Sequence, residues 1–368
     1  MATVRADATH PDVVLLTAGI RANRDTRRSC GRNGVRVGHS AVSVRGLVRR
    51  FGELEAVRGI DLDIRPGEVF GLLGPNGAGK SSTISMLCTL LRPTEGSATV
   101  AGHDVVRERD LVRRNIGLVF QDPTLDGYLT AERNLRLHAE LYGVPKAVLD
   151  DRLREVLEMV GLWERRSSKV LTFSGGMKRR LEIARGLLHA PRVLFLDEPT
   201  VGLDPQTRAS IWSYINELRK SGDGPDRITI VMTTHYMDEA EYCDRIAIMD
   251  HGRIIALDTP EALKASVGTD RVQIETDDDT AAIVALEQQF GITASIVEGA
   301  VTFGVPEGEL FAPRLFSELP VRIRRVSVSR PSLDDVFMSY TGSTIRDAEA
   351  NSMDRLRQQT AMMRRSGG

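Results

Sequence analysis

The segment Gly74–Ser81 constrains the fold of this chain more than any other, because it has the spacing GxxxxGK[ST]. It follows the apolar run Val69–Leu73, which predicts a buried strand, and it opens the helix-like stretch Lys80–Leu91, which Pro93 ends. Between a strand and a helix, glycines let backbone N–H groups curl around an anion, and the helix N-terminus adds its dipole. The chain is therefore expected to contain an α/β unit with a phosphate-binding loop.

The residues of this loop are predicted to hold the phosphates of a nucleotide. Lys80 is expected to reach the β- and γ-phosphates, and Ser81 to ligate Mg²⁺. A chance glycine-rich turn is the alternative, and the order of strand, loop and helix argues against it. The predicted nucleotide contacts are Gly74, Pro75, Asn76, Gly77, Ala78, Gly79, Lys80, Ser81 and Ser82.

A second feature is the apolar run Val193–Leu196, which ends in the carboxylates Asp197 and Glu198. A nucleotide-hydrolysing enzyme needs one carboxylate for the Mg²⁺ shell and one to orient water. We assign the first role to Asp197 and the second to Glu198. An acidic pair at a strand end is by itself more often the start of a solvated loop. Because the chain also contains the phosphate loop at Gly74, the catalytic interpretation is favoured here.

A third feature is Ser174-Gly175-Gly176, which opens the basic helix Met177-Lys178-Arg179-Arg180-Leu181. Its N-terminus is a second phosphate-ready site, far along the chain from the first. If the two cannot meet within one chain, a symmetric dimer places each against the partner's nucleotide. The alternative is an ordinary helix with Ser174 as its N-cap.

The pattern along the chain predicts two folded domains. Ile60, Leu62 and Ile64 alternate with acidic residues as in an edge strand, and the strands Val193–Leu196, Ile228–Met232 and Ile246–Met249 predict a mostly parallel sheet. Apolar residues at helical spacing predict a helical insert that Gly161 closes: Leu149, Leu153, Val156, Leu157 and Val160. The expected division is a disordered extension at 1–39, an α/β ATPase domain at 40–266, a small α+β domain at 267–341 and a flexible tail at 342–368.

The expected small domain contains two short strands, Arg271–Glu275 and Ala300–Gly304, and helices near Ala281–Gln289 and Leu310–Leu319. It carries no ligand motif, and stabilisation of the dimer is its expected role.

Composition excludes several functions. The formal net charge of -1 gives no field that would attract nucleic acid. Cys30, Cys88 and Cys243 lack CxxC spacing, which argues against a disulfide framework or a zinc site and fits a reducing cytoplasm. No apolar run approaches the roughly 18 residues of a membrane span, so a membrane role would need a partner chain.

Over Ala41–Leu257 the sequence resembles the ABC ATPase family, because these motifs occur in the family's order. Ser174-Gly175-Gly176 is similar to the family signature, although Phe173 stands where leucine is usual. The resemblance implies a head-to-tail homodimer, with Ser174 and Gly176 facing the partner's γ-phosphate.

The same resemblance assigns four further residues. It makes Gln121 a contact to Mg²⁺ or attacking water, His235 the switch residue on the γ-phosphate, Asp204 part of a loop that communicates across the dimer, and Phe51 the adenine-stacking ring. Taken singly, Gln121 could be a polar strand end, His235 a helix cap and Phe51 a core residue.

The segment Pro331–Phe337 resembles the closing motif of daunorubicin-resistance-type exporter ATPases. The resemblance implies an ATPase subunit at the cytoplasmic face of the membrane that powers a separate ABC-2-type permease exporting a drug or lipid-like substrate. The alternative is a plain amphipathic helix, with Ser332 as N-cap and Leu333, Val336 and Phe337 facing inward. The residues Asp122–Asn134 are expected to dock the permease.

Two other classes compete with this interpretation. An ABC ATPase acting on nucleic acid or ribosomes would typically show a second cassette, a coiled-coil insertion or zinc modules, and none occurs in this sequence. A GTPase switch would need an NKxD motif, which is also absent. The transported substrate stays open, because its binding surface would lie in the permease.

Overall fold

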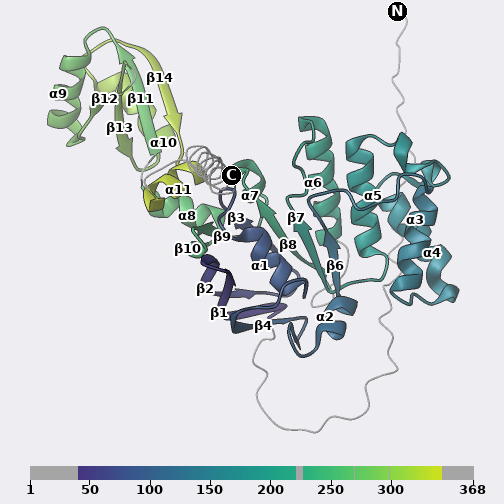
Figure 1. The fold of residues 1–368 in the computed structure, drawn as a ribbon. Coiled ribbons are helices and arrows are strands. Elements are labelled where there is room, and N and C mark those ends of the chain that lie inside the picture. Colours follow the sequence, from purple (N-terminus) through teal and green to yellow (C-terminus); the bar gives the residue numbers. More distant parts are fainter. Residues whose placement is uncertain (1–39, 221–226, 269, 298, 342–368) are drawn as a thin grey trace, which may run out of the picture.

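The computed structural model describes residues 40–220, 227–268, 270–297 and 299–341 (Figure 1). The predicted extension at 1–39 and the predicted tail at 342–368 lie outside these ranges.

A six-stranded sheet forms the centre of the larger part of the chain. Its strands are β3 (Val69–Leu73), β6 (Ile116–Val119), β7 (Val193–Asp197), β8 (Thr229–Thr234), β9 (Arg245–Asp250) and β10 (Arg253–Asp258), in the order β10-β9-β3-β8-β7-β6. Only the β10–β9 pair is antiparallel. The predicted mostly parallel sheet is thus confirmed, and its parallel strands end at one common edge.

The parallel strands read as continuous apolar runs because both faces of the sheet are covered. Phe70 and Leu72 of β3 pack on the face that contains Ile84 of α1 (Lys80–Leu87), whereas Val69 and Leu73 pack on the face that contains residues of α6 (Pro205–Lys220). Successive side chains of a strand therefore pack into two separate cores, one on each face of the sheet.

A second sheet, antiparallel and four-stranded, lies beside the first. It has the order β2-β1-β4-β5 and consists of β1 (Val42–Phe51), β2 (Leu54–Ile64), β4 (Glu95–Val100) and β5 (His103–Asp104). The predicted strand through Ile60 and Ile64 is the edge strand β2. That it belongs to a separate sheet was not apparent from the sequence.

Helices gather beyond β6 in Figure 1. They are α3 (Ala131–Leu141), α4 (Lys146–Met159) and α5 (Gly175–Leu187), while α2 (Arg109–Asn115) precedes β6. The inward face of α4 is the one that the spacing predicted, with Leu153 and Leu157 packed against Leu181 of α5 in a shared core. The helical insert is thereby confirmed.

The first helix is shorter than expected. It ends at Leu87 instead of Leu91, because Thr89 adopts φ 64 and the N–H groups of Leu90 and Leu91 both turn back to Ser85 O. The left-handed residue stops the helix before Pro93 can act.

The C-terminal part has its own core on one four-stranded antiparallel sheet, ordered β12-β13-β11-β14. Its elements are α8 (Pro260–Val267), β11 (Asp270–Thr276), α9 (Asp279–Phe290), β12 (Ser295–Val297), β13 (Ala300–Val305), α10 (Gly308–Glu318), β14 (Ile323–Ser329) and α11 (Leu333–Thr341). Of its four strands only β11 and β13 were expected, whereas α9 and α10 correspond to the two expected helices. The other two strands have weak sequence signals. β12 has only three residues, and in β14 the alternation of exposed and partly buried residues is broken at Arg324-Arg325, where its register with β11 shifts.

The last helix returns to the ATPase core. Figure 1 shows α11 beside α8, between the C-terminal sheet and the rest of the chain. Ser332 caps it, since its Oγ accepts the N–H of Asp335, whose carboxylate accepts the N–H of Ser332. Leu333, Val336 and Phe337 are buried in the core that also contains residues of β3 and α6. The predicted inward face of this helix is confirmed.

Phe337→Ala should therefore lower the free energy of unfolding by about 3–5 kcal/mol, because it removes a fully buried ring. Urea unfolding measures this loss. Met338→Ala, at a neighbouring side chain that is 47% exposed, should change the free energy by no more than about 0.5 kcal/mol. Equal effects of the two substitutions would contradict the docking of α11.

Candidate nucleotide site

The phosphate loop joins β3 to α1 and is tightly packed. Gly79 has φ 104, and a Cβ at this position would lie 2.5 Å from Ala56 O, so only glycine fits here. Lys80 is buried, and its Nζ donates to Gly74 O at 2.6 Å and to Pro75 O at 3.1 Å. The loop therefore holds a buried ammonium group among its own carbonyls.

Three side chains at the ends of β7 and β8 gather beside the loop. Ser81 Oγ donates to Asp197 Oδ1 at 3.1 Å, and Lys80 Nζ lies 3.7 Å from Glu198 Oε1. His235, just beyond β8, places Nδ1 3.5 Å from the same oxygen of Glu198. The structure thus brings together Lys80, Ser81, Asp197, Glu198 and His235 from the ends of three parallel strands.

The backbone of Glu198 is held in an unusual conformation. Its φ of 45 is in the left-handed region, which a residue with a Cβ adopts at a cost of about 1–3 kcal/mol. Its N–H donates to Thr233 Oγ1 at 2.9 Å. Such strain is concentrated at functional sites, and here it aims the carboxylate at Lys80 and His235.

Thr233 is a site residue that sequence analysis missed. Its hydroxyl also donates to Asp197 Oδ1 at 2.5 Å, so one side chain orients both the carboxylate of Asp197 and the backbone of Glu198. A signal existed, because threonine at the carboxyl end of a fully buried strand needs a polar partner there.

Glu239 in α7 (Met237–Ala240) was also missed. This buried carboxylate accepts hydrogen bonds from the hydroxyls of Thr200 and Thr234, and it lies 3.7 Å from Arg208 Nε. Glu239 therefore links Thr200, two residues after Glu198, to Thr234, which immediately precedes His235.

The pKa of Glu198 lies below its ordinary value of 4.5. Burial of the carboxyl group would raise it, but the hydrogen bond to His235 and the charge of Lys80 outweigh burial. Glu198 is therefore ionised at neutral pH, as a group that accepts a proton from water must be.

The turn at Ser174 forms a second group of predicted residues. Ser174 Oγ accepts the N–H of Met177 at 3.3 Å, as the N-cap of α5. A Cβ on Gly176 would lie 2.2 Å from Thr207 Cγ2, and one on Gly175 3.6 Å from Leu203 Cδ2. The turn and the 202–207 segment are in direct contact.

Asp204 caps α6, because its carboxylate accepts the N–H of Thr207 at 2.9 Å and the hydroxyl of Thr207 at 2.6 Å. Gln121 is exposed, two residues beyond the end of β6. Phe51 is 41% exposed at the end of β1, with the guanidinium carbon of Arg49 4.3 Å from its ring centroid. Phe51 is therefore not a core residue.

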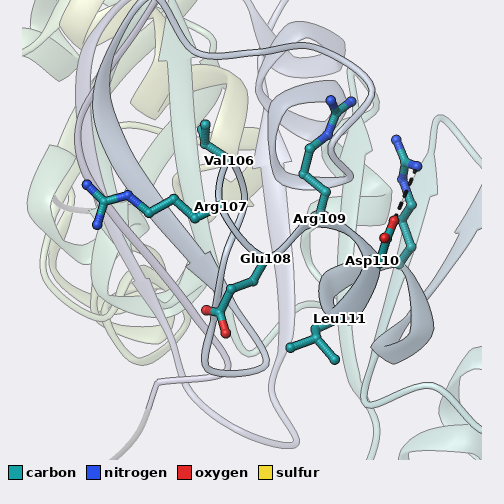
Figure 2. A pocket seen from close by; sticks show the side chains of 7 residues that line it. Val106, Arg107, Glu108, Arg109, Asp110 and Leu111 are labelled. Atoms are coloured by element: carbon teal, nitrogen blue, oxygen red, sulfur yellow. Dashed lines mark ion pairs between the residues drawn. The ribbon is translucent and has the colours of Figure 1, made fainter.

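A pocket of about 460 Å³ lies elsewhere, along the turn after β5 and the first part of α2 (Figure 2). Its lining is the single segment 106–111 with Arg113, and it includes none of the predicted site residues. Arg109 and Arg113 bond to Thr89, beyond the carboxyl end of α1, whereas the phosphate loop is at the amino end. This pocket is separate from the nucleotide site.

The lowered pKa of Glu198 predicts a pH dependence. An ionised carboxylate of this kind contributes stability that is fully present above its unfolded pKa and is lost as the pH falls through the folded pKa. Between about pH 6 and about pH 3, the unfolding free energy of the nucleotide-free protein should fall less in Glu198→Gln than in the wild type. Denaturant titrations across this range measure it. Glu155→Gln, at an exposed position on α4, is the matched control, and parallel slopes for all three proteins would contradict the assignment.

Comparison with known proteins agrees with this geometry. Residues 57–201 match the family model for ABC transporters, and residues 259–341 match that for the C-terminal domain of DrrA1-3-like ATP-binding proteins. A solved ATP-binding cassette, described as a dimer in a post-hydrolysis state bound to ADP and Pi, is 28% identical with a TM-score of 0.53, covering 59% of this chain and 98% of that one.

Two curated relatives extend over most of the chain. The daunorubicin/doxorubicin resistance ATP-binding protein DrrA of Streptomyces peucetius is 39% identical over 315 residues, which are 83% of this chain and 94% of that protein. The linearmycin resistance ATP-binding protein LnrL of Bacillus subtilis (strain 168) is 37% identical over 310 residues, covering 82% and 98%. With both family models matched in order and the strand ends converging as described, this chain belongs to the DrrA-type drug-resistance ATP-binding proteins, a group of ABC transporter ATPases.

Proposed function

We propose that this chain powers a separate ABC-2-type membrane permease by hydrolysing MgATP as a head-to-tail homodimer. The proposal rests on five side chains that converge at one sheet edge: Lys80, Ser81, Asp197, Glu198 and His235. The Ser174 turn packs instead against the 202–207 segment. The proposed location is the cytoplasmic face of the membrane.

The roles of the residues follow from their chemistry. Lys80 would bind the β- and γ-phosphates, Glu198 would accept the proton of the attacking water, and His235 would contact the γ-phosphate. Phe51 would stack on adenine with its exposed face. The backbone N–H groups of 74–82 would cradle the phosphates.

The oxygen donors at the site suit Mg²⁺, which proteins usually hold with one or two carboxylates together with substrate phosphates. Ser81 Oγ and Asp197 Oδ1 lie 3.1 Å apart, and Gln121 is the third proposed ligand. Among the residues that the structure describes, no group of three His, Cys, Asp or Glu side chains could hold a metal alone. Bound Mg²⁺ neutralises phosphate charge.

Glu198→Gln should keep MgATP binding and lose turnover by about 10²–10⁴-fold, because the amide cannot accept the proton of water. Phosphate release and equilibrium binding of a fluorescent ATP analogue measure the two properties. Glu158→Gln, on the outer surface of α4, should keep the wild-type rate. Unchanged turnover in Glu198→Gln would refute its role.

The dimer is tested by mixing two inactive variants. Lys80→Ala removes the phosphate contact and Ser174→Arg blocks the turn, so each homodimer should fall below about 1% of wild-type turnover. A mixed dimer contains one intact pair, with Lys80 from one chain and Ser174 from the other. Mixing should restore measurable turnover, and its absence would contradict composite sites between chains.

The permease would dock on Asp122–Asn134, which we call the docking segment. Tyr128 in this segment is 82% exposed, and Leu171, 52% exposed, is adjacent because its N–H donates to Gly127 O at 2.8 Å. None of the described helices is long and apolar enough to cross a bilayer. Exposed aromatic and aliphatic side chains are suited to anchor a partner chain.

Tyr128→Asp should reduce recovery of the complex by at least about tenfold while ATP binding is retained. The measurement is co-purification after co-expression with a candidate ABC-2-type permease, starting with any multi-span membrane protein that a neighbouring gene encodes. Leu54→Asp, at a 63% exposed position on β2, is the control. Full recovery with Tyr128→Asp would exclude docking through this residue.

The proposed cargo is a drug or lipid-like compound. By their names, the relatives give resistance to daunorubicin, doxorubicin and linearmycin. A screen for compounds that stimulate the turnover of the co-purified complex would identify the substrate class of this chain.

A further inference from the structure

Arg179, in the second turn of α5, is a buried arginine that the nucleotide chemistry above does not use. The residue is 6% exposed. Nε donates to Pro199 O at 2.6 Å, Nη2 to Asp197 O at 3.0 Å, and Nη1 to Phe120 O. One planar guanidinium group therefore holds three backbone carbonyls in a fixed arrangement.

These carbonyls belong to the segments that present the predicted reacting groups. Phe120 immediately precedes Gln121, while Asp197 and Pro199 lie on either side of Glu198. The ends of β6 and β7 are thus joined through Arg179 as well as through the sheet. Glu198, with its left-handed backbone, depends on contacts of this kind to keep its direction.

Glu182, one turn further along α5, connects Arg179 to the docking segment. It is 1% exposed, and its Oε2 lies 3.2 Å from Arg179 Nη1. Its Oε1 accepts the N–H of Thr124 at 2.7 Å, and Arg185 Nη1 donates to Thr124 O at 3.1 Å. The backbone of the docking segment is therefore fastened to the same helix, through Glu182 of the ion pair and through Arg185.

A buried ion pair contributes little net stability, because desolvation of both charges offsets their attraction. A displacement of either partner of the Arg179–Glu182 pair would leave a buried charge unpaired, which is strongly unfavourable. The Arg179–Glu182 pair therefore suits a positioning role more than a stabilising one.

We propose that the Arg179–Glu182 pair couples the docking segment to Glu198, so that movement of the one is transmitted to the direction of the other. This inference rests on the proposed ATPase and permease functions. Arg179 and Glu182 are positioning residues, because neither contacts the reacting groups directly. The ion pair lies on the helix whose N-terminus would face the partner's nucleotide, so closure of the dimer would act on the same pair.

The first test is the double variant Arg179→Gln/Glu182→Gln. It removes both charges together and leaves two amides able to bond to each other, so no unpaired buried charge remains. Relative to wild type, kcat should fall at least about tenfold, while KM and the Kd for MgATP stay nearly unchanged. The thermal midpoint should fall by only a few degrees, because three carbonyls lose the donor that Arg179 supplied.

The matched control is Arg180→Gln. Arg180 is the next residue of the same helix, and its Nη1 bonds to Val160 O at 3.1 Å and to Tyr214 Oη at 3.2 Å, away from the strand ends. This variant should keep the wild-type kcat. Arg179→Lys retains the charge but lacks the planar fork, so its kcat should fall as in the double variant. Arg179→Lys also provides the test if the double variant does not fold.

The second test measures transmission directly, by hydrogen exchange of the purified chain with and without MgATP. In wild type, MgATP should slow exchange in residues 74–85 and in residues 124–130, which lie beyond the proposed Mg²⁺ ligand Gln121. In the double variant it should still slow exchange in 74–85 but no longer in 124–130.

Three results would decide against the proposal. The first is a double-variant kcat within twofold of wild type. The second is a fall in kcat that comes with a comparable loss of MgATP affinity and a large drop in thermal midpoint. The third is retained protection of residues 124–130 in the double variant. Absence of turnover in the wild type and in Arg180→Gln would instead refute the ATPase function on which the proposal rests.

Discussion

Parallel hydrogen bonding of β8 between β3 and β7 is the interaction on which the nucleotide site depends. The register pairs Leu73 with Thr234 and Asp197 with Thr233. Gly74, Glu198 and His235 therefore leave the sheet at one level, although they are far apart in the sequence. A slip of one residue would turn every side chain of a strand to the opposite face and would separate the phosphate loop from its carboxylates.

Helix α5 has several contacts with functional segments along its length. Its N-terminus forms the Ser174 turn, which packs against the 202–207 segment. Its buried ion pair holds the ends of β6 and β7, and its apolar side completes the core of the helical insert. A rigid helix in this position is suited to transmit motion between the proposed dimer interface, the docking segment and Glu198, because it contacts the first two directly and the backbone on either side of Glu198.

The C-terminal part is attached by more than a linker. Phe337 and its neighbours on α11 complete the core that α6 and β3 begin. Removal of the chain after Ser266 would expose that core, so a truncation there would combine loss of the small domain with damage to the ATPase domain. Pro331–Phe337 therefore both resembles an exporter motif and forms an amphipathic helix. The structure shows what the helix does physically, because its apolar side chains pack into the core of the ATPase domain.

The sequence by itself determined the phosphate loop, the carboxylate pair and the parallel strands, because glycine spacing and doubly buried apolar runs are local signals. It also determined the inward faces of α4 and α11 from helical spacing. Only tertiary structure decided that the strand through Ile60 belongs to a separate sheet, since pairing partners are not local. Thr233, Glu239 and Arg179 likewise became visible only once distant segments met, because a buried polar side chain acquires its meaning from the partner that satisfies it.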